Sequence, residues 1–145
     1  MSLVRAPYSL TLPSDLRLLS LARLFVEFVC LHLNFDDDFT EAVQAATHEA
    51  LQNAMRHAHD GKPEALVQLE VVPLENGLEI RLHDEGERFD VTGVPHMEPG
   101  EMRIGGRGVF LMRRMMDEVV SEPRSPKGNV LRMVKLARSS QRNYA

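Results

Sequence analysis

A chain of 145 residues is about the length of one domain, so it has room for one core and no second catalytic domain. Its 43% hydrophobic and 26% charged residues are typical of a globular domain and exclude disordered and collagen-like chains. The net charge of −4 argues against direct nucleic-acid binding, which needs a basic excess to displace counterions from phosphates. The single cysteine, Cys30, forms no internal disulfide and lacks zinc-ligand spacing, which favours a reducing cytoplasm.

The first 33 residues predict a strand and a helix. Residues 9–12 alternate polar and apolar side chains up to Pro13, as in a short edge strand. Ser14 or Asp15 then caps a helix whose apolar residues recur at helical spacing over residues 18–33. This stretch carries two charged residues and is shorter than the ~20 apolar residues of a membrane helix. We therefore expect no membrane insertion.

The middle of the chain predicts a second helix and a hairpin. The helical period continues over residues 39–57 until Asp60-Gly61 ends it. It changes to a period of two at residues 66–72 and 78–82, which indicates two antiparallel strands joined by a turn.

The last part of the chain predicts a loop, a helix and two strands. Residues 85–103 have no sustained period, and loops of that length in compact domains are usually functional. Residues 105–108, Gly-Gly-Arg-Gly, open a third helix that reaches Met116. Residues 119–120 and 129–136 read as the last two strands.

This order of elements predicts an α+β fold. The economical arrangement is a two-layer sandwich with helices on one face of a mixed β-sheet. Because the sequence contains no internal repeat or linker, we expect residues 1–145 to form one domain. Its core spans about residues 9–136, and residues 137–145 form a basic tail.

The second helix holds the first polar pair suited to chemistry. Glu49 and Asn53 are four residues apart, so their side chains project from one helix face about one turn from each other. A carboxylate can serve as a base and an amide oxygen as a ligand for a hard cation. The pair alone is also compatible with an ordinary solvated helix face.

Two further groups of residues suit nucleotide binding. Asp84 ends the second hairpin strand and can accept a hydrogen bond from an exocyclic amine, while Gly86 lets a flat ring approach the backbone. Gly106 and Gly108 free the backbone at the start of a helix, where exposed amides and the positive end of the helix dipole favour a phosphate. No Gly-Lys-Ser/Thr follows, so this is not a Walker loop.

The order and spacing of these groups resemble the GHKL ATPase superfamily. Glu49 to Asn53 resembles its N box, Asp84 to Gly86 its G1 box and Gly106 to Gly108 its G2 box, with Lys127-Gly128 before the final strand. Within that superfamily the compact length and the stretch 108–119 are most similar to the anti-sigma factor serine/threonine-protein kinases. The resemblance covers about residues 9–136 and implies a Bergerat-type, histidine-kinase-like ATPase domain.

The resemblance assigns a role to each matching residue. It implies that Asn53 is the ligand of Mg²⁺ and that Glu49 is the general base for a substrate serine. Asp84 would bind the amine of the adenine of ATP, with Gly86 beneath the ring.

The glycine motif and the end of the chain complete this assignment. Gly106 and Gly108 would wrap the phosphates, and Arg107 is either a phosphate contact or a solvent-facing side chain. The family usually places a threonine after the glycine that precedes the last strand. Here Asn129 follows Gly128, which implies altered rather than lost nucleotide binding.

The function implied is an ATP-dependent protein serine kinase in the cytoplasm. It would bind a sigma factor and phosphorylate a serine of a STAS-type anti-anti-sigma protein. Its first strand and helix would pair subunits in a homodimer, or contact the partner. One alternative is an ATP-binding regulatory module without kinase activity. The other is the catalytic domain of a histidine kinase, against which the lack of a dimerisation helix with a phosphoacceptor histidine argues.

Overall fold

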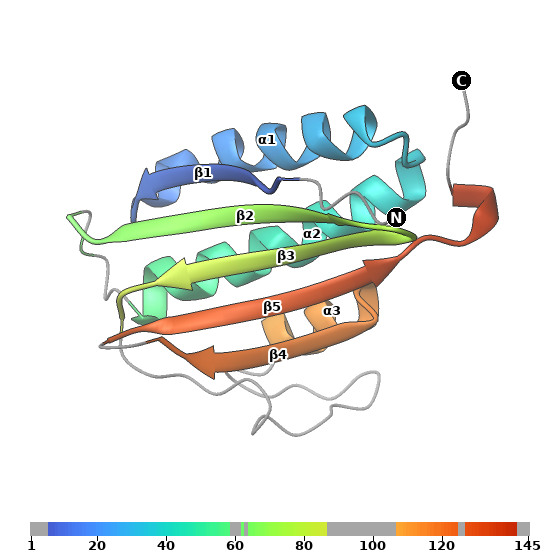
Figure 1. Cartoon of the computed structure of the whole chain (residues 1–145). Coiled ribbons are helices and arrows are strands. Elements are labelled where there is room, and N and C mark those ends of the chain that lie inside the picture. Colours follow the sequence, from blue (N-terminus) through green and yellow to red (C-terminus); the bar gives the residue numbers. More distant parts are fainter. Residues whose placement is uncertain (1–5, 59–61, 63, 87–106, 125–126, 142–145) are drawn as a thin grey trace.

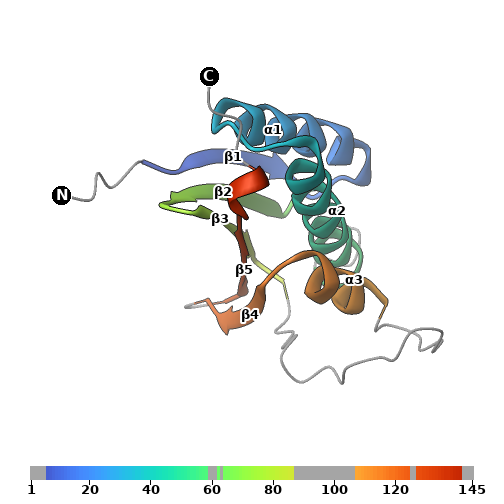
Figure 2. The ribbon, with the colours of Figure 1, turned by 90° about the vertical axis from the view of Figure 1, so that its right-hand side faces the viewer.

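The computed structural model describes residues 6–58, 62, 64–86, 107–124 and 127–141. Five strands form one sheet, and the helices cover one of its faces (Figures 1 and 2). The strands are β1 (Tyr8–Pro13), β2 (Leu66–Leu74), β3 (Gly77–Asp84), β4 (Glu118–Pro123) and β5 (Asn129–Leu136). The α-helices are α1 (Leu19–His32), α2 (Asp37–Asn53) and α3 (Arg107–Met115), with short turns η1 (Leu16–Leu18), η2 (Ala54–Ala58) and η4 (Ser139–Gln141). The predicted α+β two-layer architecture is confirmed.

The sheet is antiparallel throughout its described pairings, so the prediction of a mixed sheet is wrong. Its order is β1-β2-β3-β5-β4, and each neighbouring pair is antiparallel. The reason lies in the connection between β1 and β2. Because α1 and α2 form a helical hairpin, they return the chain to the end of the sheet where β1 finishes, and Pro13 pairs with Leu66. A single crossover helix would have made the two strands parallel.

A tight turn between α1 and α2 fixes the start of the second helix. Asn34 has a φ of +67°, a conformation that asparagine tolerates better than most residues. The Asp36 carboxylate then caps α2 by accepting a hydrogen bond from the Phe39 backbone N–H at 2.8 Å. Asp37 and Asp38 fill the first turn, where the helix dipole favours negative charge. The helix therefore starts two residues before the apolar period that predicted it.

The far end of α2 also differs from the prediction. The α-helix ends at Asn53, and residues 54–58 continue as a π-helical turn. The predicted stop at Asp60-Gly61 lies outside the described residues, as does all but the start of the predicted loop 85–103. None of the helices in the described ranges is long and apolar enough to span a membrane.

The core lies between the sheet and the helices. Alternate residues of the strands and one face of each helix supply its side chains, which is the pattern of a half-buried sheet. Its most deeply buried large members are Phe35, Phe39, Leu51, Met55, Leu69, Leu78, Ile80, Leu82, Met112 and Met133.

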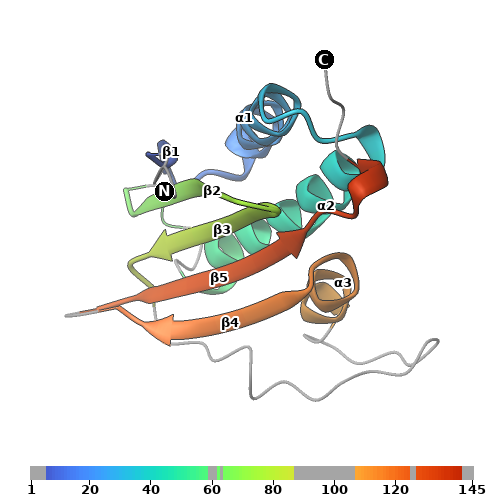
Figure 3. The ribbon, with the colours of Figure 1, turned by 45° about the vertical axis from the view of Figure 1, so that its right-hand side comes forward.

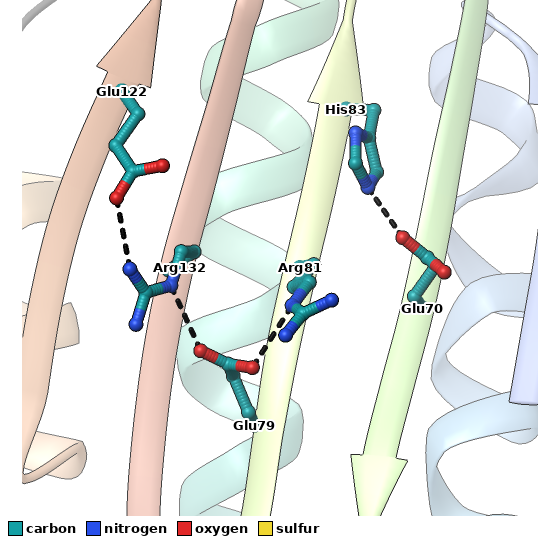
Figure 4. A network of polar contacts seen from close by, with 6 residues as sticks. All are labelled: Glu70, Glu79, Arg81, His83, Glu122 and Arg132. Carbon is teal, nitrogen blue, oxygen red and sulfur yellow. Dashed lines mark hydrogen bonds and ion pairs between the residues drawn. The ribbon is translucent and has the colours of Figure 1, made fainter. Parts of the chain in front are cut away.

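The other face of the sheet carries paired charges (Figure 4). Glu79 is 5% exposed and accepts hydrogen bonds from Nε of Arg81 and Nε of Arg132, both at 2.9 Å. Arg132 also donates to Glu122 at 2.8 Å, and His83 contacts Glu70 on the neighbouring strand. The charges of this face are therefore largely satisfied by one another.

The last described residue of the chain, Gln141, contacts the start of α2. The carbonyl of Gln141, in η4, accepts a hydrogen bond from the Asp36 backbone N–H at 2.7 Å. Ala137 N–H donates to the Asn76 carbonyl at 2.7 Å. At least residues 137–141 of the predicted tail therefore contact the domain.

Candidate nucleotide site

Glu49 and Asn53 lie on the face of α2 that meets α3. Both side chains are half-buried, whereas the neighbouring Ala46 and Ala50 face the core. The i, i+4 spacing predicted that the carboxylate and the amide share one helix face, and the structure agrees.

The start of α3 contacts both of these side chains. A Cβ added to Gly108 would lie 2.9 Å from Nδ2 of Asn53 and 3.1 Å from Oε2 of Glu49. Such distances are shorter than nearly all Cβ contacts, so only glycine lets the helix come this close without displacing a side chain. Gly108, the Glu49 carboxylate and the Asn53 amide therefore form one cluster.

This cluster suits a Mg²⁺ ion that is shared with a nucleotide. Among the described residues, no group of three or more His, Cys, Asp or Glu side chains forms a self-sufficient metal site. Mg²⁺ commonly keeps several waters and is bound by one or two protein oxygens plus substrate phosphates. One amide oxygen at Asn53, beside the N-terminal turn of α3, fits that mode of binding.

Asp84 forms a second cluster at the end of β3. It continues the alternation that turns Ile80 and Leu82 toward the helices, and it is 6% exposed. Its Oδ1 accepts hydrogen bonds from the Gly86 backbone N–H at 2.9 Å and from Nδ2 of Asn129 at 3.1 Å. A buried carboxylate held by two donors has a fixed orientation.

The β4–β5 turn supports Asp84 through its backbone. Gly128 has a φ of +108°, and a Cβ on it would lie 2.0 Å from the Asp84 carbonyl oxygen. Only glycine satisfies both the conformation and this close approach. Arg124 donates through Nη1 to the same carbonyl at 3.3 Å, and its N–H donates to the Gly128 carbonyl at 3.0 Å. The turn therefore supports the residue predicted to bind adenine.

The two clusters lie at the same end of the molecule. Figures 1 and 3 both show the C-terminal end of α2 close to the C-terminal end of β3, where β5 begins. Of the remaining predicted residues, Gly106 lies outside the described residues. Arg107 begins α3, but its side chain is not among those described.

Sequence reasoning missed Arg124. It is separated from Asp84 by 40 residues, and an arginine before a turn has no pattern that announces a contact with a distant carbonyl. Cys30 is a buried core residue of α1. Burial raises the pKa of its thiol to about 12, so it has no thiolate character suited to nucleophilic chemistry near neutral pH.

Comparison with known proteins identifies the family of this chain. The family model of the histidine kinase-like ATPase domain matches residues 12–135. The serine-protein kinase RsbW of Listeria monocytogenes serotype 4a is 33% identical over 119 residues, which cover 77% of this chain and 76% of the relative. The serine-protein kinase RsbW of Staphylococcus epidermidis is 30% identical over 139 residues, covering 90% and 86%.

A solved structure supports the fold. The crystal structure of the RsbU and RsbW domains of Rv1364c from Mycobacterium tuberculosis matches 97% of this chain, with a TM-score of 0.63 and 13% identity. The match spans 35% of that longer chain. The family model and the curated relatives each cover most of the chain, so this protein belongs to the histidine kinase-like ATPase family, and within it to the RsbW-type serine-protein kinases.

Proposed function

We propose that the protein is an anti-sigma factor kinase that uses Mg²⁺-ATP to phosphorylate a serine of a STAS-type anti-anti-sigma protein. The observation that carries the proposal is the contact of Gly108 with both Glu49 and Asn53. It brings a carboxylate, a side-chain amide and the N-terminal turn of α3 close together. Phosphoryl transfer needs this combination, because its catalysis rests on positioning and charge neutralisation.

In the proposed reaction, Glu49 accepts the proton of the substrate serine. The serine oxygen forms a bond to the γ-phosphorus as the bond to the β,γ-bridging oxygen breaks, which yields phosphoserine and ADP. Asn53 would hold the metal, which would supply charge neutralisation at the phosphates. The N-terminal amides of α3 hold the phosphates, and Asp84 orients the other end of the nucleotide through the adenine amine.

The resemblance to anti-sigma kinases also supplies the proposed partners. The protein would sequester a sigma factor in the cytoplasm until its antagonist is available. Phosphorylation of the antagonist would prevent it from displacing the sigma factor. Incubation of the purified protein with a STAS protein from the same cell and radiolabelled ATP tests this proposal. Serine phosphorylation supports it, and no transfer to any STAS protein of that cell contradicts it.

We expect Mg²⁺-dependent binding of ATP and ADP. Calorimetric titration with and without EDTA measures it. Asp84→Asn should lower the affinity by about 10- to 150-fold, because an acceptor carboxylate is lost and a hydrogen bond to a charged group contributes about 1.5–3 kcal/mol. Asp38→Asn is the matched control on the exposed first turn of α2, and it should leave affinity unchanged. A parent protein that binds no nucleotide at millimolar ATP would contradict the proposed site.

An exposed apolar row on α1 supports the proposed homodimer. Its members are Leu21, Leu24, Phe28 and Leu31, which follow helical spacing, and Leu24 and Phe28 are 61% and 68% exposed. The ring of Phe28 stacks on His32, which also meets Tyr8 of β1 edge-on. Phe25, on the same helix, is half-buried and packs against the core. Within the described residues, β1 pairs only with β2 and leaves a sheet edge beside the row.

Phe28→Glu is expected to weaken self-association by at least about 100-fold. A two-fold interface contains each residue twice, and a buried aromatic residue often contributes 2 kcal/mol or more. Sedimentation equilibrium across micromolar concentrations measures the change. Leu136→Glu, at an exposed leucine on β5, is the matched control and should leave association unchanged. A parent protein that stays monomeric up to millimolar concentration would rule out the homodimer.

A further inference from the structure

Asn129 occupies the position where the family usually has a threonine, and its side chain contacts Asp84. Its Nδ2 donates to Oδ1 of Asp84 at 3.1 Å, and both residues are 6% exposed. A carboxylate oxygen only accepts, so the amide must turn its nitrogen toward Asp84. The two residues are also register partners at the ends of β3 and β5, which fixes the spacing of their backbones.

The contact fills Oδ1 of Asp84. A carboxylate oxygen has about two lone-pair positions. The Gly86 N–H at 2.9 Å takes one, and the Asn129 amide takes the other. Both of these hydrogen bonds go to Oδ1, and within the described residues no donor reaches Oδ2. Asp84 therefore offers a ligand one oxygen rather than two.

We propose that Asn129 is a specificity-determining residue that makes Asp84 a single-oxygen acceptor and so selects adenine against guanine. This inference rests on the proposed function, because it assumes that the base of the nucleotide reaches Asp84. Asn129 acts through Asp84 and is a positioning residue rather than a catalytic one.

The chemistry of the two purines explains the selection. Adenine presents one amino donor, at N6, beside the N1 acceptor. One carboxylate oxygen is enough to accept a hydrogen bond from that amine. Guanine has a carbonyl oxygen in place of that amine, and its donors N1–H and N2–H₂ lie side by side. A carboxylate with both oxygens available can accept that pair in parallel, as it does with the two donors of an arginine. Occupation of Oδ1 removes this option and leaves a guanine donor unpaired in a buried site.

The backbone of Asp84 is held separately from its carboxylate. The Asp84 carbonyl is held by the Arg124 guanidinium and by the close approach of Gly128. Arg124 touches the main chain of Asp84 and not its carboxylate. It therefore offers a control that disturbs the same residue without freeing Oδ1.

The test is the ratio of the dissociation constants for GTP and ATP, measured by calorimetry on the full chain. Asn129→Ala frees a lone-pair position on Oδ1, and the ratio should fall by at least tenfold from the parent value. Asn129→Thr restores a hydroxyl donor and should return the ratio toward the parent value. Arg124→Ala should weaken both nucleotides by a similar factor and leave the ratio unchanged. Thermal unfolding of each variant checks that it remains folded.

Inosine triphosphate distinguishes the mechanism. Its base lacks the 2-amino group, so it presents only one of the two donors of guanine. Asn129→Ala should therefore improve GTP binding relative to ATP more than it improves binding of inosine triphosphate. An equal loss of ATP and GTP affinity in Asn129→Ala would overturn the inference while leaving the ATP site intact. Absence of any nucleotide binding by the parent would instead contradict the proposed function.

Discussion

Glu49→Gln is expected to lower phosphoryl transfer to the serine of the antagonist by about 10²–10⁴-fold, the usual contribution of a general base. ATP affinity should stay within a few-fold of the parent value. Glutamine keeps the length and helical propensity of glutamate but removes the oxygen that accepts the proton. The measurement is radiolabelled phosphate incorporation at saturating ATP, beside a nucleotide titration of the same preparation.

Glu41→Gln is the matched control for this experiment. It makes the same chemical change on the exposed face of α2, away from Gly108, and should leave both transfer and binding unchanged. Transfer at the parental rate by Glu49→Gln would show that the base assignment is wrong. A loss of ATP affinity equal to the loss of transfer would assign Glu49 to binding instead.

Asn53→Ala is expected to remove both transfer and Mg²⁺-dependent nucleotide binding. The amide oxygen is the proposed protein ligand of the ion, and Mg²⁺ in such sites relies on few protein ligands. ATP affinity with Mg²⁺ should therefore fall to the value that the parent shows in EDTA. Calorimetric titrations of parent and variant, each with and without EDTA, measure this directly.

Gln52→Ala is the control for this second variant. It truncates the neighbouring side chain on α2, which is half-buried like Asn53 but does not meet the start of α3 in the contacts described. Its Mg²⁺ dependence should match the parent. If Asn53→Ala kept the parental response to EDTA, the metal-ligand assignment would fail even where transfer was lost.

The sequence predicted the elements of this fold better than their directions. Periodicity placed α1, the β2–β3 hairpin and β5 to within a few residues, because each pattern is local and strongly amphipathic. The prediction of a mixed sheet was wrong because strand direction depends on how α1 and α2 pack against each other, and periodicity does not show that packing. The early start of α2 follows from capping by Asp36, a polar residue that the hydrophobic periodicity does not detect.

In the candidate site, too, some of the arrangement was predictable from the sequence and some was not. Glu49 and Asn53 were predicted to share a face because helical spacing is a geometric rule. The approach of Gly108 to both could be expected only from resemblance, since 55 residues separate it from Asn53. The contact of Arg124 with the Asp84 carbonyl had no sequence signal, because it depends on the register between β3 and β5. Local chemistry was therefore predictable, and long-range positioning was not.

The place of β5 in the sheet has a consequence for how the protein is synthesised. This strand is the last of the described strands, yet it lies between β3 and β4 and brings Asn129 beside Asp84. Until it emerges from the ribosome, β4 lacks its only neighbour within the described sheet, and Asp84 lacks one of its two donors. Gln141 meets Asp36 later still. A nascent chain can form the α1–α2 hairpin early, but it acquires the complete Asp84 cluster only after β5 has left the ribosome.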